Sequence, residues 1–427
     1  MNARWWHIAD TRFVLSGVRY ALVGVCLAAG VAVSAARAEA EAPGETTAGA
    51  TMVPAEVMTT APVTSREIGD GVWWVPDLVS ETSVTQTLDD LTSWGMSNVY
   101  VCVFDSGYTL HRSDVFPPWP DAVTRDWLSI IIAEAHQRNI RVHAWVPVLY
   151  WPFADENHPA LKGNPHWLEV DRDGMIAGAN GTPGRYISPA APEFRVAMQE
   201  LLAELCEYPL DGIHLDALTY NASRDTGYHP VLVREFRGAN GDLEPADLRR
   251  DDSPGSDWMK WVTLREDALT STVQVLSGRV REQARAQNRR ILVSASVTPG
   301  YESSRGLNTR YQYWTAWLKG GLLDFVTPQC FENDLSELEQ QLWEARNYYQ
   351  KSGVACVPGL KIEPAANDVA PTVAEQKRAL GNVGFQFATI MDYTTLREAM
   401  QNEQAAEGEK KEAFWKAWFT KDDGGKE

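Results

Sequence analysis

Several signatures of common enzyme classes are missing from this sequence. It has only 5 cysteines in 427 residues, and none of them stands in a C-x-x-C pair, so a cysteine-based metal site is not expected. The helical H-E-x-x-H pattern of zinc hydrolases does not occur. No glycine-rich phosphate loop follows the first expected strand, where the chain reads Val75-Pro76-Asp77-Leu78. The sequence therefore predicts a protein that needs no metal and no cofactor.

Basic residues are also few. Lysine and arginine together number 39 against 57 aspartates and glutamates, which gives a formal net charge of -18 at pH 7. A surface of this sign repels phosphate groups, so nucleic acid and anionic membranes are not expected as partners. A neutral or cationic ligand is favoured instead.

Long apolar runs are absent outside the N-terminus. There, a start with three arginines precedes an apolar stretch at 20–34 and an A-x-A cleavage pattern at Ala36-Arg37-Ala38. This order is typical of a secretory signal peptide over residues 1–38. An uncleaved anchor is the alternative, although the apolar run is short for a bilayer span. We expect an exported protein that is periplasmic or secreted, with no integral membrane segment after cleavage.

The four remaining cysteines bear on the state of an exported protein. Cys102, Cys206, Cys330 and Cys356 are far apart in the sequence, and most of them fall in expected strands. Buried free thiols are the expected state. A Cys330–Cys356 disulfide is the alternative, because exported proteins meet oxidising conditions.

Strand and helix patterns alternate along residues 71–420. The expected strands are 72–78, 98–105, 141–150, 212–218, 291–297, 325–331, 355–360 and 385–391. Helical patterns follow them, and the longest spans about 257–287. Eight such units predict an α/β fold with a single (β/α)8 TIM barrel, and an open doubly wound sheet is the alternative. Long loops are expected after strands 3 and 4, at 151–191 and 219–256. Residues 39–70 form an expected flexible linker, and 421–427 an expected disordered tail.

One stretch, Asp211-Gly212-Ile213-His214-Leu215-Asp216, organises the prediction of a site. Side chains alternate along a strand, so Ile213 and Leu215 face one way, and His214 and Asp216 face the other. Asp216 stands at the carboxyl end of the strand, which is the catalytic rim of a TIM barrel. A buried carboxylate is costly unless it is paired or used in chemistry. A catalytic Asp216 is preferred here over a carboxylate that bonds His214 and holds the rim together.

The other expected strands also end in polar residues. The candidates at or just beyond these ends are Asp77, Asp105, His143, Trp145, His214, Asp216, Ser296, Thr298, Glu302, Gln329, Glu332, Lys361, Glu363 and Asp392. Paired carboxylates among aromatic side chains suit glycoside hydrolysis, in which one acid protonates the leaving oxygen and a second carboxylate acts at the anomeric centre. Asp216 is the first choice, and Glu332 is slightly preferred to Glu302 as its partner.

Aromatic and histidine side chains complete the predicted site. Tryptophans such as Trp73, Trp145 and Trp151 are candidate platforms for sugar rings, and Trp151 is favoured because a loop has little core to fill. His143 and His214 lie on adjacent expected strands. They are interpreted either as hydrogen-bond donors to substrate or Asp216, or as satisfied interior histidines.

An ordered set of motifs resembles the glycosyl hydrolase-like family 10 of bacterial exported TIM-barrel proteins. The set spans nearly all of residues 70–396 and includes Gly71-Val72-Trp73, Val142-His143-Ala144-Trp145, Tyr186-Ile187-Ser188-Pro189, Asp211-Gly212-Ile213-His214-Leu215-Asp216, Gly227-Tyr228, Trp261 with Arg265, Ser294-Ala295-Ser296-Val297 and Pro328-Gln329. The resemblance implies a (β/α)8 barrel that acts on glycosidic bonds, with bacterial cell-wall glycan as the substrate best associated with relatives. It places Asp216 on the family's strand-4 aspartate, and His143, Trp145, His214 and Tyr220 on family rim positions.

The chain departs from the family pattern after strands 4 and 6. Ala217 and Thr219 replace a second acid or aromatic residue and an arginine, and Cys330-Phe331-Glu332 replaces an aromatic motif. The preferred hypothesis is an exported glycoside hydrolase that uses Asp216 and a rim glutamate on a polysaccharide. The alternatives are a non-catalytic glycan-binding barrel and a metal-dependent hydrolase or deacetylase.

Overall fold

The computed structural model describes residues 62–64, 67–78, 80–155, 157–176, 184–222, 224–300, 310–352, 354–362 and 373–399. The expected signal peptide, the expected tail at 421–427 and Glu302 lie outside these residues. In the described part of the chain, no helix combines the length and the apolar character that a bilayer span requires.

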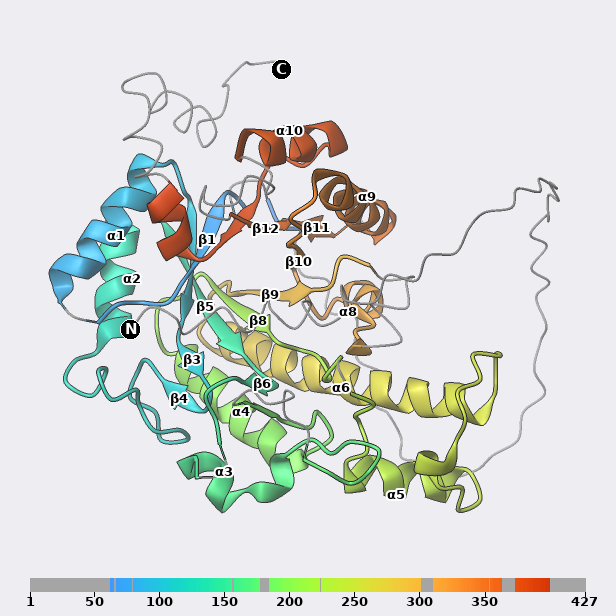
Figure 1. The fold of residues 1–427 in the computed structure, drawn as a ribbon. Helices are drawn as coiled ribbons and strands as arrows, with labels where there is room; N and C mark the ends of the chain where they lie inside the picture. The colour runs from blue at the N-terminus through green and yellow to red at the C-terminus, as the bar shows by residue number, and fades with distance from the viewer. Residues whose placement is uncertain are drawn as a thin grey trace, which may run out of the picture. The chain divides into compact units, whose positions relative to one another are not determined.

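A closed parallel barrel forms the centre of the fold (Figure 1). Its strands are β1 (Gly71–Trp74), β2 (Asn98–Cys102), β5 (Arg141–Pro147), β8 (Gly212–Asp216), β9 (Leu292–Val297), β10 (Phe325–Cys330), β11 with β12 (Ala355–Cys356 and Gly359–Lys361) and β13 (Thr389–Met391). They pair in chain order, and β13 pairs with β1 to close the ring. The predicted single (β/α)8 barrel is confirmed.

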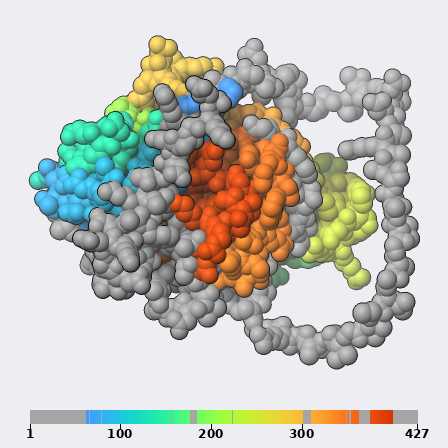
Figure 2. All heavy atoms as spheres, turned by 90° about the horizontal axis from the view of Figure 1, so that it is seen from above, coloured from blue at the N-terminus to red at the C-terminus, as the bar shows by residue number. Residues whose placement is uncertain are grey.

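Helices surround the strands. They are α1 (Glu81–Ser93), α2 (Trp127–Gln137), α4 (Pro192–Leu205), α6 (Asp257–Ala286), α8 (Trp314–Lys319), α9 (Leu335–Ser352) and α10 (Val373–Val383). Asp126 caps α2 as its position suggests, since its carboxylate accepts a hydrogen bond from the Ser129 amide. Seen from above, orange to red residues, which include the neighbouring α9 and α10, lie in the middle of the molecule (Figure 2).

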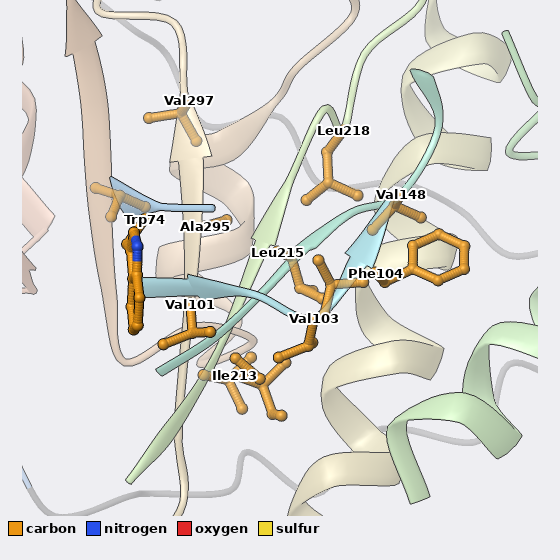
Figure 3. Close-up of a cluster of buried hydrophobic side chains, with 14 of the residues drawn as sticks. Trp74, Val101, Val103, Phe104, Val148, Ile213, Leu215, Leu218, Ala295 and Val297 are labelled. Carbon is orange, nitrogen blue, oxygen red and sulfur yellow. The ribbon is translucent and has the colours of Figure 1, made fainter. Parts of the chain in front are cut away.

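Apolar side chains on the outer face of the strands build the core. Ile213 and Leu215 are fully buried on β8, and they lie in one hydrophobic cluster with Val101 of β2, Val103 just after β2 and Ala295 of β9 (Figure 3). The same cluster includes side chains of α4 and α6. Because of strand alternation, this packing turns His214 and Asp216 toward the barrel interior.

The two long loops contain structure of their own. The loop after β5 holds β6 (Tyr150–Trp151), α3 (Pro159–Gly163), the 3-10 helix η2 (Pro165–Trp167) and β7 (Arg185–Tyr186). The loop after β8 holds α5 (Pro230–Ala239) and the 3-10 helix η3 (Pro245–Asp247). We call these loops, together with residues 257–267 of α6, the loop layer. The expectation that a loop has little core to fill was wrong for this layer.

Several strand boundaries differ from the predicted ones. The second expected strand divides into β2 and β3 (Phe104–Asp105), and β3 pairs with β4 (Tyr108–Thr109) in a separate antiparallel hairpin. The seventh strand is interrupted between Cys356 and Gly359, where Pro358 has no amide hydrogen for the ladder. The eighth begins at Thr389, four residues later than expected.

Candidate functional site

Asp216 lies at the carboxyl end of β8 and is 4% exposed. Protein donors reach both oxygens of its carboxylate. The indole Nε1 of Trp145 donates to Oδ2 at 2.8 Å, and the Ala217 amide donates to Oδ1 at 2.7 Å. The amide Nε2 of Gln329 donates to Oδ1 at the longer distance of 3.4 Å. Gln329, a candidate at the end of the sixth expected strand, therefore lies beside Asp216.

Two opposing effects act on this carboxylate. Burial raises the pKa of Asp216, because the charged form loses water. Hydrogen bonds from the Ala217 amide, the Trp145 indole and the Ser296 hydroxyl favour the charged form and lower the pKa again. Ala217 reaches its position with φ of 51°, a left-handed conformation that is costly for alanine. The backbone of this rim position is therefore held by its surroundings.

His214 bonds to two serines of β9 and not to Asp216. Its Nδ1 lies 2.9 Å from the Ser294 hydroxyl, and its Nε2 lies 2.9 Å from the Ser296 hydroxyl. The ring is fully buried, and burial lowers its pKa well below the usual value, so the ring is neutral. The structure therefore contradicts two expectations for His214, a hydrogen bond to Asp216 and a hydrogen bond to substrate.

His143 lies deeper in the barrel. Its ring stacks on Tyr100 at 4.9 Å, and its Nε2 lies 3.2 Å from Oδ1 of Asn98. Burial lowers the pKa of His143 to about 4. With no exposed surface, this histidine is an interior residue, and the interpretation as a substrate donor is wrong.

Aromatic rings lie around the mouth of the barrel. The Trp73 ring lies 6.4 Å from Trp145, 5.8 Å from His214 and 6.2 Å from Phe331. Trp73 and Trp145 are 4% and 8% exposed. The predicted pair of tryptophans is therefore brought together beside Asp216, and it presents only a small edge to solvent.

Asp105 is a second carboxylate whose charge, like that of Asp216, acts on Cys102. It is buried at the end of β3, and the Ser106 hydroxyl donates to its Oδ1 at 2.9 Å. Burial raises the pKa of the Cys102 thiol, and the charges of Asp105 and Asp216 raise it further. Both carboxylates thus act on the same side chain at the end of β2.

Two other predicted acids accept hydrogen bonds from neighbouring helical segments. Glu332 accepts a hydrogen bond from Nε2 of Gln341 at 2.6 Å, and Gln341 belongs to α9. Asp392 accepts hydrogen bonds from the amide of Thr394 and the hydroxyl of Thr395, which is the arrangement of a helix cap. Glu302 lies outside the described residues.

Three predicted substrate contacts are buried in or beside the loop layer. Trp151 has no exposed surface and packs on Phe104, Phe116 and Phe194. Tyr220 is 1% exposed and donates to the Arg265 carbonyl, and Tyr228 donates to Asp225. A ring without an exposed face cannot stack on a sugar, so the prediction of a substrate platform at Trp151 is wrong.

Sequence reasoning gave no role to the residues that hold the loop layer together. Arg265 is fully buried, and its guanidinium lies 3.0 Å from Oδ1 of Asp225 and 4.2 Å from the centre of the Tyr311 ring. Glu169 accepts hydrogen bonds from the amides of Val170 and Gly227, which joins the two loops. The sequence pattern could have indicated a buried role for Arg265, because it is an arginine within an apolar helix face. No sequence pattern indicated a role for Glu169.

The described segments contain no group of three or more histidine, cysteine, aspartate or glutamate side chains arranged to hold a metal ion. Cys102, Cys206, Cys330 and Cys356 are free thiols. The sheet register places Cys356 opposite Val326, four residues from Cys330 along β10.

The TIM-barrel fold of this chain is shared with solved glycosidases. Solved structures with similar folds include an alpha-L-fucosidase isoenzyme 2 from Paenibacillus thiaminolyticus (TM-score 0.53, 15% identity, 81% of this chain and 50% of that chain). A beta-galactosidase from Halorubrum lacusprofundi has a TM-score of 0.54 at 11% identity, over 76% of this chain and 52% of that one.

The chain itself belongs to the glycosyl hydrolase-like 10 family, whose model matches residues 69–378. Among curated relatives, glycosyl hydrolase DigH of Escherichia coli K12 is 25% identical over 270 residues, which are 59% of this chain and 58% of the relative. Glycosyl hydrolase YngK of Bacillus subtilis is 26% identical over 153 residues, which are 31% of this chain and 27% of the relative. The chain thus matches little more than half the length of DigH. Membership in this family supports a glycosidase-type function.

Proposed function

We propose that this protein is an exported glycoside hydrolase and that Asp216 is its catalytic carboxylate. The observation that carries the proposal is the position of Asp216: it is a buried, inward-facing carboxylate at the carboxyl end of a barrel strand, and Trp145, Ala217 and Gln329 orient it. In TIM barrels this end of the strands is where catalytic side chains are found. Family membership supports the same reaction class.

The donors around Asp216 suit the role of nucleophile or general base. The Trp145 indole and the Ala217 amide only donate, and therefore they hold the carboxylate in its charged, electron-rich form. A rim glutamate, Glu332 or Glu302, is proposed to protonate the leaving oxygen. The separation of the two carboxyl groups decides the stereochemistry, at about 5 Å for retention and about 6.5–9.5 Å for inversion.

The proposed substrate is a polysaccharide, with bacterial cell-wall glycan as the first choice. An N-terminal signal peptide would bring the protein to the periplasm or the medium, where this glycan is found. The acidic net charge of -18 suits a ligand that is neutral or cationic.

Product release from purified cell-wall glycan and from a panel of polysaccharides tests this function. Wild type is compared with Asp216→Asn, which keeps the shape of the side chain, and with Asp121→Asn, which changes an exposed aspartate. We expect cleavage by wild type and by Asp121→Asn, and a loss of at least a thousandfold in Asp216→Asn. Glu332→Gln and Glu302→Gln then identify the acid.

A glycan-binding barrel without turnover is the second candidate. Its support is that protein donors already occupy both oxygens of a carboxylate that is 4% exposed. In that case neither wild type nor Asp216→Asn releases product, and both bind the same glycan with similar affinity in calorimetry.

A further inference from the structure

A groove lies between helices α5 and α6, which pack against each other in the loop layer (Figure 1). Its volume is about 460 Å³. Sites that hold small organic molecules typically measure about 300–1,000 Å³. The lining includes none of Trp145, Ala217 and Gln329, whose donors reach Asp216. The groove is therefore separate from the candidate catalytic site.

Helical spacing explains which side chains of α6 line this groove. Lys260, Leu264 and Asp267 follow one another at intervals of four and three residues, so they share one face of the helix. Trp261 is fully buried on another face, where the Phe236 ring of α5 packs on it at 5.2 Å. The groove therefore opens outward on a pair of helices whose inner faces are packed together.

Two carboxylates line the groove, Glu235 from α5 and Asp267 from α6. Both side chains reach solvent, and neither forms an ion pair with a residue that the structure describes. A lysine of the lining, Lys260, is already neutralised, because its Nζ lies 2.8 Å from Oδ1 of Asp257. Partial burial alone raises the pKa of Asp267. The groove thus carries negative charge that the described protein groups do not balance, and a cationic ligand complements it.

The remaining lining is partly apolar and partly hydrogen-bonding. Met259 and Leu264 are half-buried and present aliphatic surface. Nδ2 of Asn240 donates to the Phe236 carbonyl at 2.8 Å, which turns its amide oxygen into the acceptor for a ligand. Thr263 adds an exposed hydroxyl group. A ligand that combines ammonium groups, hydroxyl groups and apolar C–H faces matches this lining, and amino sugars have all three.

We propose that the groove between α5 and α6 is a second glycan-binding site, and that it takes a glycan with free amino groups, such as a chain of glucosamine units. The ammonium groups bind Glu235 and Asp267, and the sugar hydroxyls bind Asn240 and Thr263. An N-acetylated unit has no charge for these carboxylates. A small aliphatic diamine satisfies the charges but leaves the hydrogen-bonding groups unused. Binding itself is independent of catalysis, whereas the anchoring of a polymeric substrate rests on the proposed glycosidase function.

Carbon-13 NMR of methionine methyl groups reads the groove directly, because Met259 lines it. The Met259 signal is assigned by its loss in Met259→Leu. Three probes are titrated at pH 6, where a primary amine is charged: a glucosamine tetramer, an N-acetylglucosamine tetramer of the same linkage, and 1,5-diaminopentane. We expect the glucosamine tetramer to shift the signal saturably and to bind at least about tenfold more tightly than the other two. No saturable shift with this tetramer, or equal affinity for either of the other probes, overturns the proposal.

Matched variants locate the site. Glu235→Gln and Asp267→Asn should each raise the Kd of the glucosamine tetramer about three- to fivefold, and the double variant about tenfold or more. Ala239→Trp, which fills the groove from an exposed position of its lining, should raise the Kd at least about tenfold. The control joins Asp121→Asn with Glu337→Gln, which removes two exposed charges elsewhere, and it should stay within about twofold of wild type. An equal loss in the control, or full affinity in Ala239→Trp, contradicts a site in this groove.

The kinetic readout is separate from this measurement. On a long glycan with free amino groups, the double variant of Glu235 and Asp267 should raise KM about tenfold and leave kcat unchanged, because the groove holds substrate and transition state equally. An unchanged KM overturns the anchoring role. Asp216→Asn should lose turnover and keep the response of the Met259 signal. If no glycan is cleaved, the proposed function fails, while the Met259 signal still decides on the groove.

Discussion

The barrel interior buries two neutral histidines, whereas the loop layer above it buries two glutamates with raised pKa values. The interior holds His143 and His214, which burial keeps neutral. The loop layer holds Glu169 and Glu266, whose pKa values burial raises to about 7 and about 8, beside the buried Arg265. We expect the buried histidines to weaken the fold as pH falls and the buried glutamates to weaken it as pH rises.

The sign of each effect follows from proton linkage. The pKa of His143 is lower in the folded state than in the unfolded chain, so its contribution is present above about pH 6.5 and is lost as pH falls toward 4. The pKa values of Glu169 and Glu266 are higher in the folded state. Their contribution is present below about pH 4.3 and is lost as pH rises through 7 and 8.

The largest loss of stability is expected when the buried arginine of the loop layer, Arg265, is replaced. Arg265→Met removes the partner of Asp225 and the cation beside Tyr311, and it should lower the free energy of unfolding by about 3–4 kcal/mol. Urea denaturation at pH 6 measures it. Arg234→Met, at an exposed position of α5, is the control and should change stability by less than about 0.5 kcal/mol. Equal effects of the two variants would contradict the role of Arg265.

The second prediction tests whether a buried glutamate lowers the stability of the loop layer at alkaline pH. Glu169→Gln keeps an acceptor for the Gly227 amide and has no proton to lose. At pH 9 the variant should be about 3 kcal/mol more stable than wild type, because one pKa unit corresponds to about 1.4 kcal/mol. At pH 5 the difference should fall below about 1 kcal/mol. A gain that does not depend on pH would show that burial of charge is not the cause.

The third prediction tests how tightly the barrel interior is packed. A Cβ at Gly212 would lie 2.2 Å from Nδ1 of His143 and 3.0 Å from the Leu292 carbonyl oxygen. Gly212→Ala should therefore cost about 2 kcal/mol, as overpacking does in other cores. Gly163→Ala, at the end of α3, meets no atom within 4 Å and serves as the control in thermal unfolding. A thermal midpoint of Gly212→Ala that equals that of Gly163→Ala would mean that the interior has room.

The smallest effect concerns the donors to Asp216. Trp145→Phe keeps the ring and removes the 2.8 Å hydrogen bond, so kcat/KM should fall about tenfold and its acid limb should move to higher pH. Gln329→Leu removes a donor at 3.4 Å and should cost less than about threefold. Steady-state kinetics on the glycan identified above compare the two. If Gln329→Leu lowered kcat/KM more than Trp145→Phe, hydrogen-bond distance would not determine how much each donor contributes.

Much of the barrel could be predicted from local pattern. The alternation of Ile213 and Leu215 with His214 and Asp216 indicates a strand with one apolar face, and eight such units indicate a closed barrel. Interruptions were harder to predict, because β3 leaves the barrel for a hairpin and Pro358 divides the seventh strand. Composition shows that a segment is apolar, whereas ladder partners decide where a strand ends.

The predictions for the site also divide into features set by local sequence and features set by the tertiary structure. Asp216 as an inward rim carboxylate follows from sequence alternation alone, and so does the inward face of Gln329, because the period of two acts locally. Only the tertiary structure shows which residues His214 bonds and that Trp151 is buried. It also shows that Glu169 accepts a hydrogen bond from the Gly227 amide. These contacts join residues that are far apart in the chain, and register and loop packing, which no local pattern encodes, bring them together.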